Sequence, residues 1–168
     1  MPLTMYEAPV GPFRRQLNAL EQILVKAATH VAHKGYDPAN LLQARLYPDM
    51  FPLLRQVQIA CDMAKSGAAR LAGMEPPRHE DNETSFDELR ARIGKTLAFV
   101  ASIDRALIEG SEERPIKVPQ RDRTLELSGR DYLFGYVLPN VHLHAATAYN
   151  ILRHNGVDLG KKDFLGGG

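Results

Sequence analysis

The sequence contains one cysteine, Cys61, in 168 residues. A single thiol excludes an internal disulfide framework and fits a reducing compartment. The N-terminal residues MPLTMYEAPVGPFRRQ lack a positively charged start and an apolar core, so they are not expected to act as a secretory signal. No apolar run approaches the roughly 20 residues that cross a bilayer. These absences favour a soluble, cytoplasmic protein without a membrane partner.

An excess of charge of one sign is also missing. The chain has 21 Lys and Arg residues against 20 Asp and Glu residues, a net charge of +1 at pH 7. There is no basic block and no interleaving of arginine with aromatic residues, so the charge pattern does not indicate binding to nucleic acid. The length predicts a single domain over residues 1–168, which buries about two-thirds of its unfolded surface.

Four segments have the apolar periodicity of helices. In the first, apolar residues from Tyr6 to Val31 recur in steps of four and three, the spacing of a helix that packs along its length. Two prolines near its start predict that the regular helix begins only after Gly11. Gly35 suits the left-handed position that closes a helix.

The second and third segments carry recognisable end signals. The second starts between Pro48 and Pro52, where proline fits a first turn, and ends at Gly73. Its alanine-rich apolar face indicates close approach to another helix. The third begins with a capping-box pattern, in which the side chains of Ser85 and Glu88 satisfy each other's free backbone N–H groups.

The apolar stripe of the third segment runs from Phe86 to Leu107. The fourth segment opens with a weaker cap at Ser128 and stops at Gly156. Between them, residues 110–128 alternate weakly between polar and apolar. This stretch is compatible with a small hairpin, but its prolines and charges favour an exposed connection.

Four helices with matching apolar stripes predict an all-α four-helix bundle, with long connections between the second and third and the third and fourth helices. Residues 75–84 can extend about 33 Å at roughly 3.3 Å per residue. A helix from Pro52 to Gly73 is also about 33 Å long, at roughly 1.5 Å per residue. This connection can therefore run back along the bundle and permits parallel second and third helices.

The inner face of the fourth helix is expected to turn polar at its centre. At heptad spacing this face carries Asn140, His144 and Thr147. A polar group in a bundle core costs about 1–3 kcal/mol unless it finds a partner, so facing helices are expected to supply partners. On the second helix, Gln56 is placed to hydrogen-bond His144 or Asn140. Pro139 is expected to kink the helix.

The histidines near the C-terminus do not form a cluster. His142 and His144 lie about 200° apart around a helix, and His154 lies about 15 Å beyond His144. Only His144 faces the predicted core. His79, in the charged segment RHEDNET, is expected to be solvated.

Two interpretations of His144 remain open from the residues alone. One is a satisfied hydrogen-bond network with Gln56 and Asn140. The other is a metal site, which one imidazole and two amides would make weak, because zinc and its neighbours favour imidazole, thiolate and carboxylate ligands. Asp62 is a nearby carboxylate but lies off the face of Gln56. Cys61 is expected to be a small core residue and not a nucleophile.

The chain resembles the DinB/YfiT-like superfamily, which includes metalloenzymes. The resemblance covers nearly the whole chain and rests on LLRQVQIA in the second helix, PNVHLHAATAYNILRHNGV in the fourth, and GKKDFLG beyond it. The last two segments are similar to the signature of one branch, a family described as a domain of unknown function. The resemblance implies a bundle with up-down-down-up topology.

The same resemblance implies a degenerate metal site. Metal-binding members carry one histidine on the second helix and an H-x-x-x-H pair on the fourth. Aligned on the L-R-x-x-G ending, these positions fall on Gln56, Asn140 and His144, so one of three ligands is kept. Thr147 is predicted to line the surrounding pocket, and Tyr149 to line it or to face a dimer partner.

Two functions follow as alternatives. The favoured one is a non-enzymatic protein, expected to be a homodimer, which binds a small molecule in its polar pocket without a metal cofactor. The other is a metal-dependent thiol transferase or hydrolase that holds zinc, nickel or manganese near His144. His144 could also act as a general base without metal. Phe164 and Leu165, in the tail 157–168, are expected to pack on the bundle or on a partner subunit.

Overall fold

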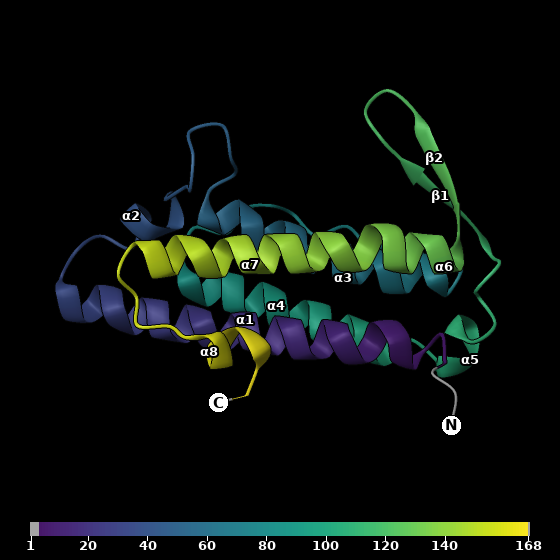
Figure 1. The fold of residues 1–168 in the computed structure, drawn as a ribbon, viewed down its shortest axis with the longest axis horizontal. Coiled ribbons are helices and arrows are strands. Elements are labelled where there is room, and N and C mark those ends of the chain that lie inside the picture. Colours follow the sequence, from purple (N-terminus) through teal and green to yellow (C-terminus); the bar gives the residue numbers. More distant parts are fainter. Residues whose placement is uncertain (1–3, 168) are drawn as a thin grey trace.

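The computed structural model describes residues 4–167. Four long helices lie side by side, as predicted: α1 (Glu7–Lys34), α3 (Leu53–Leu71), α4 (Phe86–Ser102) and α7 (Leu138–His154) (Figure 1). The shorter elements are α2 (Ala39–Leu42), α5 (Arg105–Ile108), β1 (Pro115–Pro119), β2 (Thr124–Ser128), α6 (Gly129–Tyr132), the π-helix η1 (Leu133–Val137) and α8 (Lys161–Leu165).

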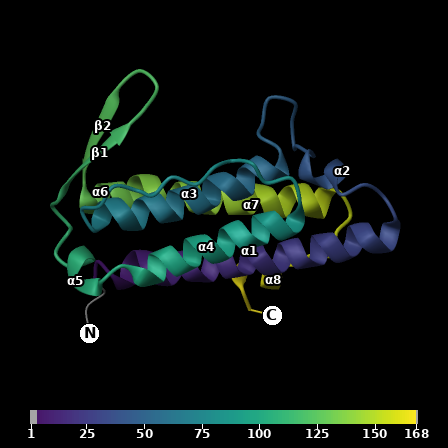
Figure 2. The same cartoon turned by 180° about the vertical axis from the view of Figure 1, so that it is seen from behind.

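The long helices run up, down, down and up, which confirms the predicted topology. Helices α1 and α7 point one way along the bundle, and α3 and α4 point the other way (Figures 1 and 2). The parallel pair α3 and α4 is possible because residues 72–85 run back along the bundle before α4 begins. Helix α3 packs against α7 and α4, and α1 packs against α4 and α7.

Helix α1 begins earlier than predicted, at Glu7 and not after Gly11. Pro9 lies in the first turn, where backbone N–H groups have no intrahelical acceptor, so its missing N–H removes no bond. Pro12 removes one bond further along. The fully buried Phe13, next to it, anchors this turn in the core and offsets that loss.

The predicted end signals of α3, α4 and α6 are present. Gly73, just beyond α3, has a φ of 72°. Ser85 Oγ accepts a hydrogen bond from the Glu88 N–H at 3.2 Å, and Glu88 Oε2 accepts one from the Ser85 N–H at 3.0 Å, which together form the capping box. Ser128 Oγ accepts a hydrogen bond from the Asp131 N–H at 3.1 Å and caps α6.

Helix α4 ends before the apolar stripe that predicted it. It stops at Ser102, and Ile103 has an extended backbone with a ψ of 125°. Asp104 Oδ1 then accepts a hydrogen bond from the Ala106 N–H at 2.9 Å and starts α5. Leu107, the last member of the stripe, is exposed as a result.

Residues 115–128 form an antiparallel hairpin, so the exposed connection favoured from the sequence is wrong. The two prolines, Pro115 and Pro119, occupy the first and last positions of β1, where a missing N–H costs least. Ile116 and Val118 are buried between them. The hairpin projects from one end of the bundle (Figure 1).

The fourth helix is built from α6, η1 and α7 in succession. A π-helical segment accommodates Pro139: the Leu138 N–H donates to the carbonyl of Leu133, five residues earlier. Such a π-turn inserts one extra residue and rotates everything that follows by about 100° relative to a regular helix.

This rotation moves the buried face of α7 by one position from the predicted one. Asn140 and His144 are half-buried at the edge of the core, so placing them in its centre was wrong. Thr147 is buried, as predicted. The residues that face the core are Val141, Ala145, Ala148, Ile151 and Leu152.

The C-terminal residues lie against α1, where helix α8 packs (Figure 1). Lys26 Nζ lies 2.7 Å from Asp163 Oδ1. Gln16 Nε2 donates to the carbonyl of Phe164 at 3.4 Å. These contacts tie the tail to the bundle of its own chain.

We predict opposite effects for two glycine-to-alanine changes in helix interiors. A Cβ at Gly67 would lie 2.6 Å from Val137 Cγ1, so Gly67→Ala should lower the free energy of unfolding by about 1–2 kcal/mol. Gly94 has nothing within 4 Å, so Gly94→Ala should raise it by about 0.5–1 kcal/mol. Urea denaturation measures both; equal changes would contradict the close approach of α3 to the fourth helix.

Candidate functional site

Gln56 on α3 and His144 on α7 meet at the edge of the bundle. His144 Nδ1 lies 2.7 Å from Gln56 Oε1, so the hydrogen bond expected between these residues is present. Gln56 Nε2 donates to the backbone carbonyl of Phe51 at 2.9 Å. Two hydrogen bonds in series therefore link Phe51, which lies just before α3, to the imidazole of His144 on α7.

This series determines which nitrogen of His144 carries the proton. Because the Gln56 amide nitrogen faces the carbonyl of Phe51, its oxygen faces His144, and an amide oxygen only accepts. Nδ1 must therefore be the donor. Burial lowers the pKa of His144, and the positive charge of Arg55 lowers it further, so the ring is neutral near pH 7. In the neutral ring Nε2 is an acceptor, and among residues 4–167 it has no hydrogen-bond partner.

A small open cavity adjoins this pair. Its volume is about 170 Å³, close to the roughly 150 Å³ of a cavity that encloses a benzene ring. Apolar side chains form much of its wall, including Phe51 and Leu143, which are 53% and 60% exposed. The residues that line it are Asp49, Met50, Phe51, Gln56, Leu143, His144 and Thr147.

Asn140 and Thr147 take their partners from their own helix, whereas facing helices were expected to supply them. Asn140 Nδ2 donates to the Tyr136 carbonyl at 2.7 Å, and Thr147 Oγ1 donates to the Leu143 carbonyl at 2.8 Å. Thr147 is among the residues that line the cavity.

Tyr149 lies on another face of α7 and does not line this cavity. It is five residues beyond His144, which places it about 140° further around the helix. Its ring instead packs edge-on against Phe164 of α8, with 5.9 Å between ring centroids.

The residues at this site do not fit a metal ion. Gln56 Oε1 is occupied by His144 Nδ1, and Asn140 Nδ2 donates to the Tyr136 carbonyl, which leaves His144 Nε2 and the carboxylate of Asp49 at the rim, too few ligands to hold an ion. Asp62 is bound elsewhere, to Arg92 at 2.9 Å. Within residues 4–167, no group of three His, Cys, Asp or Glu side chains could hold a metal.

Cys61 is fully buried in the core. Burial raises the pKa of its thiol to about 12, although the charge of Arg92 acts in the opposite direction. The thiol is therefore protonated at neutral pH and does not act as a nucleophile.

An ionic cluster that was not predicted from the sequence surrounds Arg92 on α4, whose side chain is only 2% exposed. Its guanidinium lies 2.9 Å from Asp62 on α3, 3.0 Å from Asp81 and 2.9 Å from Glu83. Asp81 and Glu83 both belong to the connection before α4, and Arg92 also donates to the carbonyl of Glu80. One arginine thus ties the long connection to α3 and α4.

Further side chains of α3 complete this cluster. Gln58 donates to Glu83 at 2.8 Å, and Lys65 pairs with Asp62 at 2.8 Å. Burial alone would raise the pKa of Glu83, but the hydrogen bonds from Arg92 and Gln58 lower it overall. The only signal in the sequence was the position of Arg92, three residues after Leu89 on an otherwise apolar stripe.

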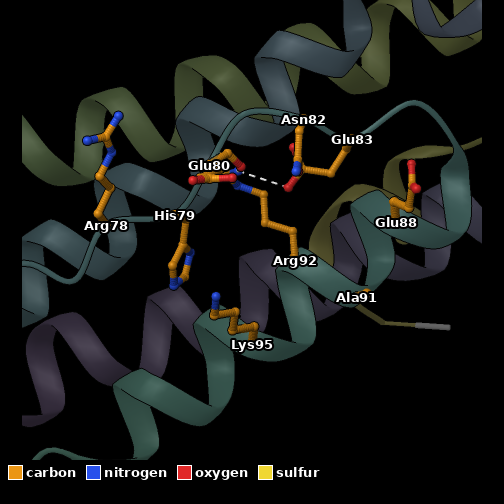
Figure 3. A pocket seen from close by; sticks show the side chains of 9 residues that line it. All are labelled: Arg78, His79, Glu80, Asn82, Glu83, Glu88, Ala91, Arg92 and Lys95. Atoms are coloured by element: carbon orange, nitrogen blue, oxygen red, sulfur yellow. Dashed lines mark hydrogen bonds and ion pairs between the residues drawn. The ribbon is translucent and has the colours of Figure 1, made fainter.

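A second cavity, of about 470 Å³, lies between this connection and α4 (Figure 3). His79 lines it and is half-buried, so the prediction that His79 is solvated is wrong. The connection lies along the bundle and turns the ring towards Lys95 on α4 (Figure 3). Its Nδ1 is buried without a hydrogen-bond partner among residues 4–167.

This fold and the site at its edge define a DinB-like four-helix bundle. The chain is similar to a DinB family member protein from Shewanella denitrificans, whose crystal structure is known. The two share 40% sequence identity, and their structures superpose with a TM-score of 0.86. The match covers 96% of this chain and 91% of that one.

The chain belongs to the family described as domain of unknown function DUF1993, whose model matches residues 5–165. Both parts of the resemblance predicted from the sequence are therefore confirmed. No curated protein matches the chain. Within residues 4–167, no helix combines the length and apolar character needed to span a bilayer.

We expect Arg92→Met to lower the free energy of unfolding by about 2–4 kcal/mol at pH 7, because it leaves three carboxylates, the least exposed of them Glu83, without their shared buried cation. Arg90→Met, two residues away, removes only exposed ion pairs and should cost about 1 kcal/mol or less. Urea denaturation measures both variants, and similar losses would contradict a special role for Arg92.

The same pair of variants tests the charge state of the cluster. The pKa of Glu83 is lowered in the folded protein, so its contribution to stability is present at neutral pH and is lost as the pH falls through that pKa. The difference between wild type and Arg92→Met should therefore shrink in acid. A difference that is constant with pH would show that Arg92 acts through packing alone.

Proposed function

We propose that the protein binds a ring-sized small molecule, without a metal ion, in the cavity beside Gln56 and His144. The observation that carries this proposal is the hydrogen-bond series from Phe51 through Gln56 to His144. It presents one unshared imidazole nitrogen of defined protonation at an open, largely apolar cavity. The homodimer and the cytoplasmic location expected from the sequence remain predictions.

The polar groups around the cavity indicate which ligand it would accept. Gln56 is only 3% exposed, and its amide nitrogen donates one of its two hydrogens to Phe51; the Thr147 hydroxyl hydrogen is also engaged. The groups left for a ligand are acceptors: His144 Nε2 and the exposed carboxylate of Asp49 at the rim. The ligand must therefore bring a donor, such as a hydroxyl or an amine.

The apolar wall and the small volume restrict the rest of the ligand. Met50, Phe51 and Leu143 would cover hydrocarbon, and a volume near 170 Å³ admits about one ring. The lining residues include neither serine nor cysteine, so no covalent intermediate on those groups is expected. A small cyclic or aromatic alcohol or amine fits these features best.

Calorimetric titration with phenol, benzylamine and toluene tests this proposal. Phenol and benzylamine should bind about tenfold more tightly than toluene, because each supplies the donor that Nε2 lacks. His144→Ala should abolish this preference. The exposed His142, whose Nδ1 lies 2.8 Å from the carbonyl of Leu138 on its own helix, provides the control His142→Ala, which should leave it unchanged. Equal binding of toluene would contradict the proposal.

The affinity for phenol should depend on pH through His144. Because the pKa of His144 is lowered, its ring gains a proton only at a lower pH than an ordinary imidazole, whose pKa is about 6.5. The affinity for phenol should therefore fall at a pH below that of an ordinary histidine. Gln56→Glu places a carboxylate beside Nδ1 and should move this fall to higher pH. Calorimetric titration measures both; an unmoved profile would mean that another group controls binding.

A further inference from the structure

The cavity between the 72–85 connection and α4 is separate from the His144 cavity, since the two share no lining residue. At about 470 Å³ it is also the larger of the two. Figure 3 shows its side chains arising from two sources, the connection and the outer face of α4. The residues that line it are Arg78, His79, Glu80, Asn82, Glu83, Glu88, Ala91, Arg92 and Lys95.

Several charged groups at this cavity are already engaged. The charge of Arg92 is shared among Asp62, Asp81 and Glu83. Glu88 Oε2 accepts hydrogen bonds from the backbone at the start of α4. These groups have little capacity left for a ligand.

His79 and Lys95 are different, because the structure shows no hydrogen bond or ion pair for either side chain among residues 4–167. Figure 3 shows the His79 ring and the Lys95 ammonium directed toward the same space. Arg78 points away from both, and Glu80 is the one lining carboxylate of the described chain whose side chain has neither a hydrogen bond nor a salt bridge.

Among the neighbouring charges, the cations have the larger effect on His79. Burial lowers its pKa, and Lys65 on α3 together with Lys95 and Arg92 on α4 lowers it further, against Asp62 on α3. Of the three carboxylates that line the cavity, Glu83 and Glu88 are engaged by Arg92, Gln58 and backbone N–H groups, whereas Lys95 and the unpartnered imidazole remain available to an anion.

We propose that this cavity binds an oxyanion, a phosphate or sulfate group, between His79 and Lys95. A tetrahedral oxyanion offers several acceptor oxygens, so it can accept from the Lys95 ammonium and from the His79 ring at once. The cavity is larger than such a group, which leaves room for a small organic molecule attached to it. The ligand class is therefore a small phosphorylated or sulfated molecule, with the free anion as the simplest member.

Titration with inorganic phosphate at constant ionic strength, followed by NMR of the His79 ring, tests this inference. Phosphate should shift the His79 resonances saturably and raise the His79 pKa, because binding of an anion and of a proton to neighbouring sites favour each other. Sodium chloride at equal ionic strength should do neither. If chloride has the same effect, the inference is wrong.

Three variants separate a defined site from general charge attraction. Lys95→Met should weaken phosphate binding about threefold to tenfold. Glu80→Gln, which removes the unpaired carboxylate, should strengthen it by about twofold. Lys117→Met removes an equal charge on the distant hairpin and should have no effect (Figure 1). Equal weakening by the two lysine variants would overturn the proposal.

Titration with glycerol 3-phosphate tests whether the ligand is a phosphorylated organic molecule or the free anion. Tighter binding than inorganic phosphate would support a phosphorylated molecule, and equal or weaker binding would assign the site to the free anion. Phenol binding at His144 should be unchanged in Lys95→Met. A failure of the oxyanion proposal at the His79 cavity is thus distinguishable from a failure of the proposed ring binding at the His144 cavity.

Discussion

The buried guanidinium of Arg92 stabilises the topology of the bundle, because it attaches the connection between α3 and α4 to both helices. Parallel α3 and α4 require a connection that returns along the bundle, and such a connection brings backbone and carboxylates against the core. Removing charges from water is costly, and that cost is offset only when several partners compensate it. Arg92 meets Asp62, Asp81 and Glu83 together with a backbone carbonyl, so the connection is attached to both helices that it joins. The cavity at His79 lies beside this attachment.

The π-turn before Pro139 determines which residues of α7 face the core. By inserting one residue it turns Val141 and Ala145 into the core and moves His144 to its edge. There the imidazole meets Gln56 and keeps one nitrogen unshared. A regular helix would have buried that nitrogen among apolar side chains, where an unpaired acceptor costs about 1–3 kcal/mol. At the edge, it is available to a ligand.

Both cavities lie where an irregular connection crosses a regular helix. Residues 43–52 cover one end of α3 beside His144, and residues 72–85 cover α4 beside His79. Loops held on a rigid scaffold commonly carry binding residues, because they present polar groups that a close-packed helix pair cannot accommodate. In this DUF1993 bundle, each cavity holds one histidine beside such a connection, and only His144 lies at a position for which the superfamily resemblance implied a metal ligand.

The sequence by itself determined the four helices and their capping residues, because apolar periodicity and local caps are local or repeating signals. It placed Gln56 opposite His144 and Asn140, but only the tertiary structure chose His144 as its partner. The sequence did not determine the start of α1, the hairpin or the phase of α7, since these depend on packing and on one inserted residue. The Arg92 cluster and the burial of His79 were decided only in the tertiary structure. Asp62, Asp81, Glu83 and Arg92 are distant in sequence and become one site only when the connection lies along the bundle.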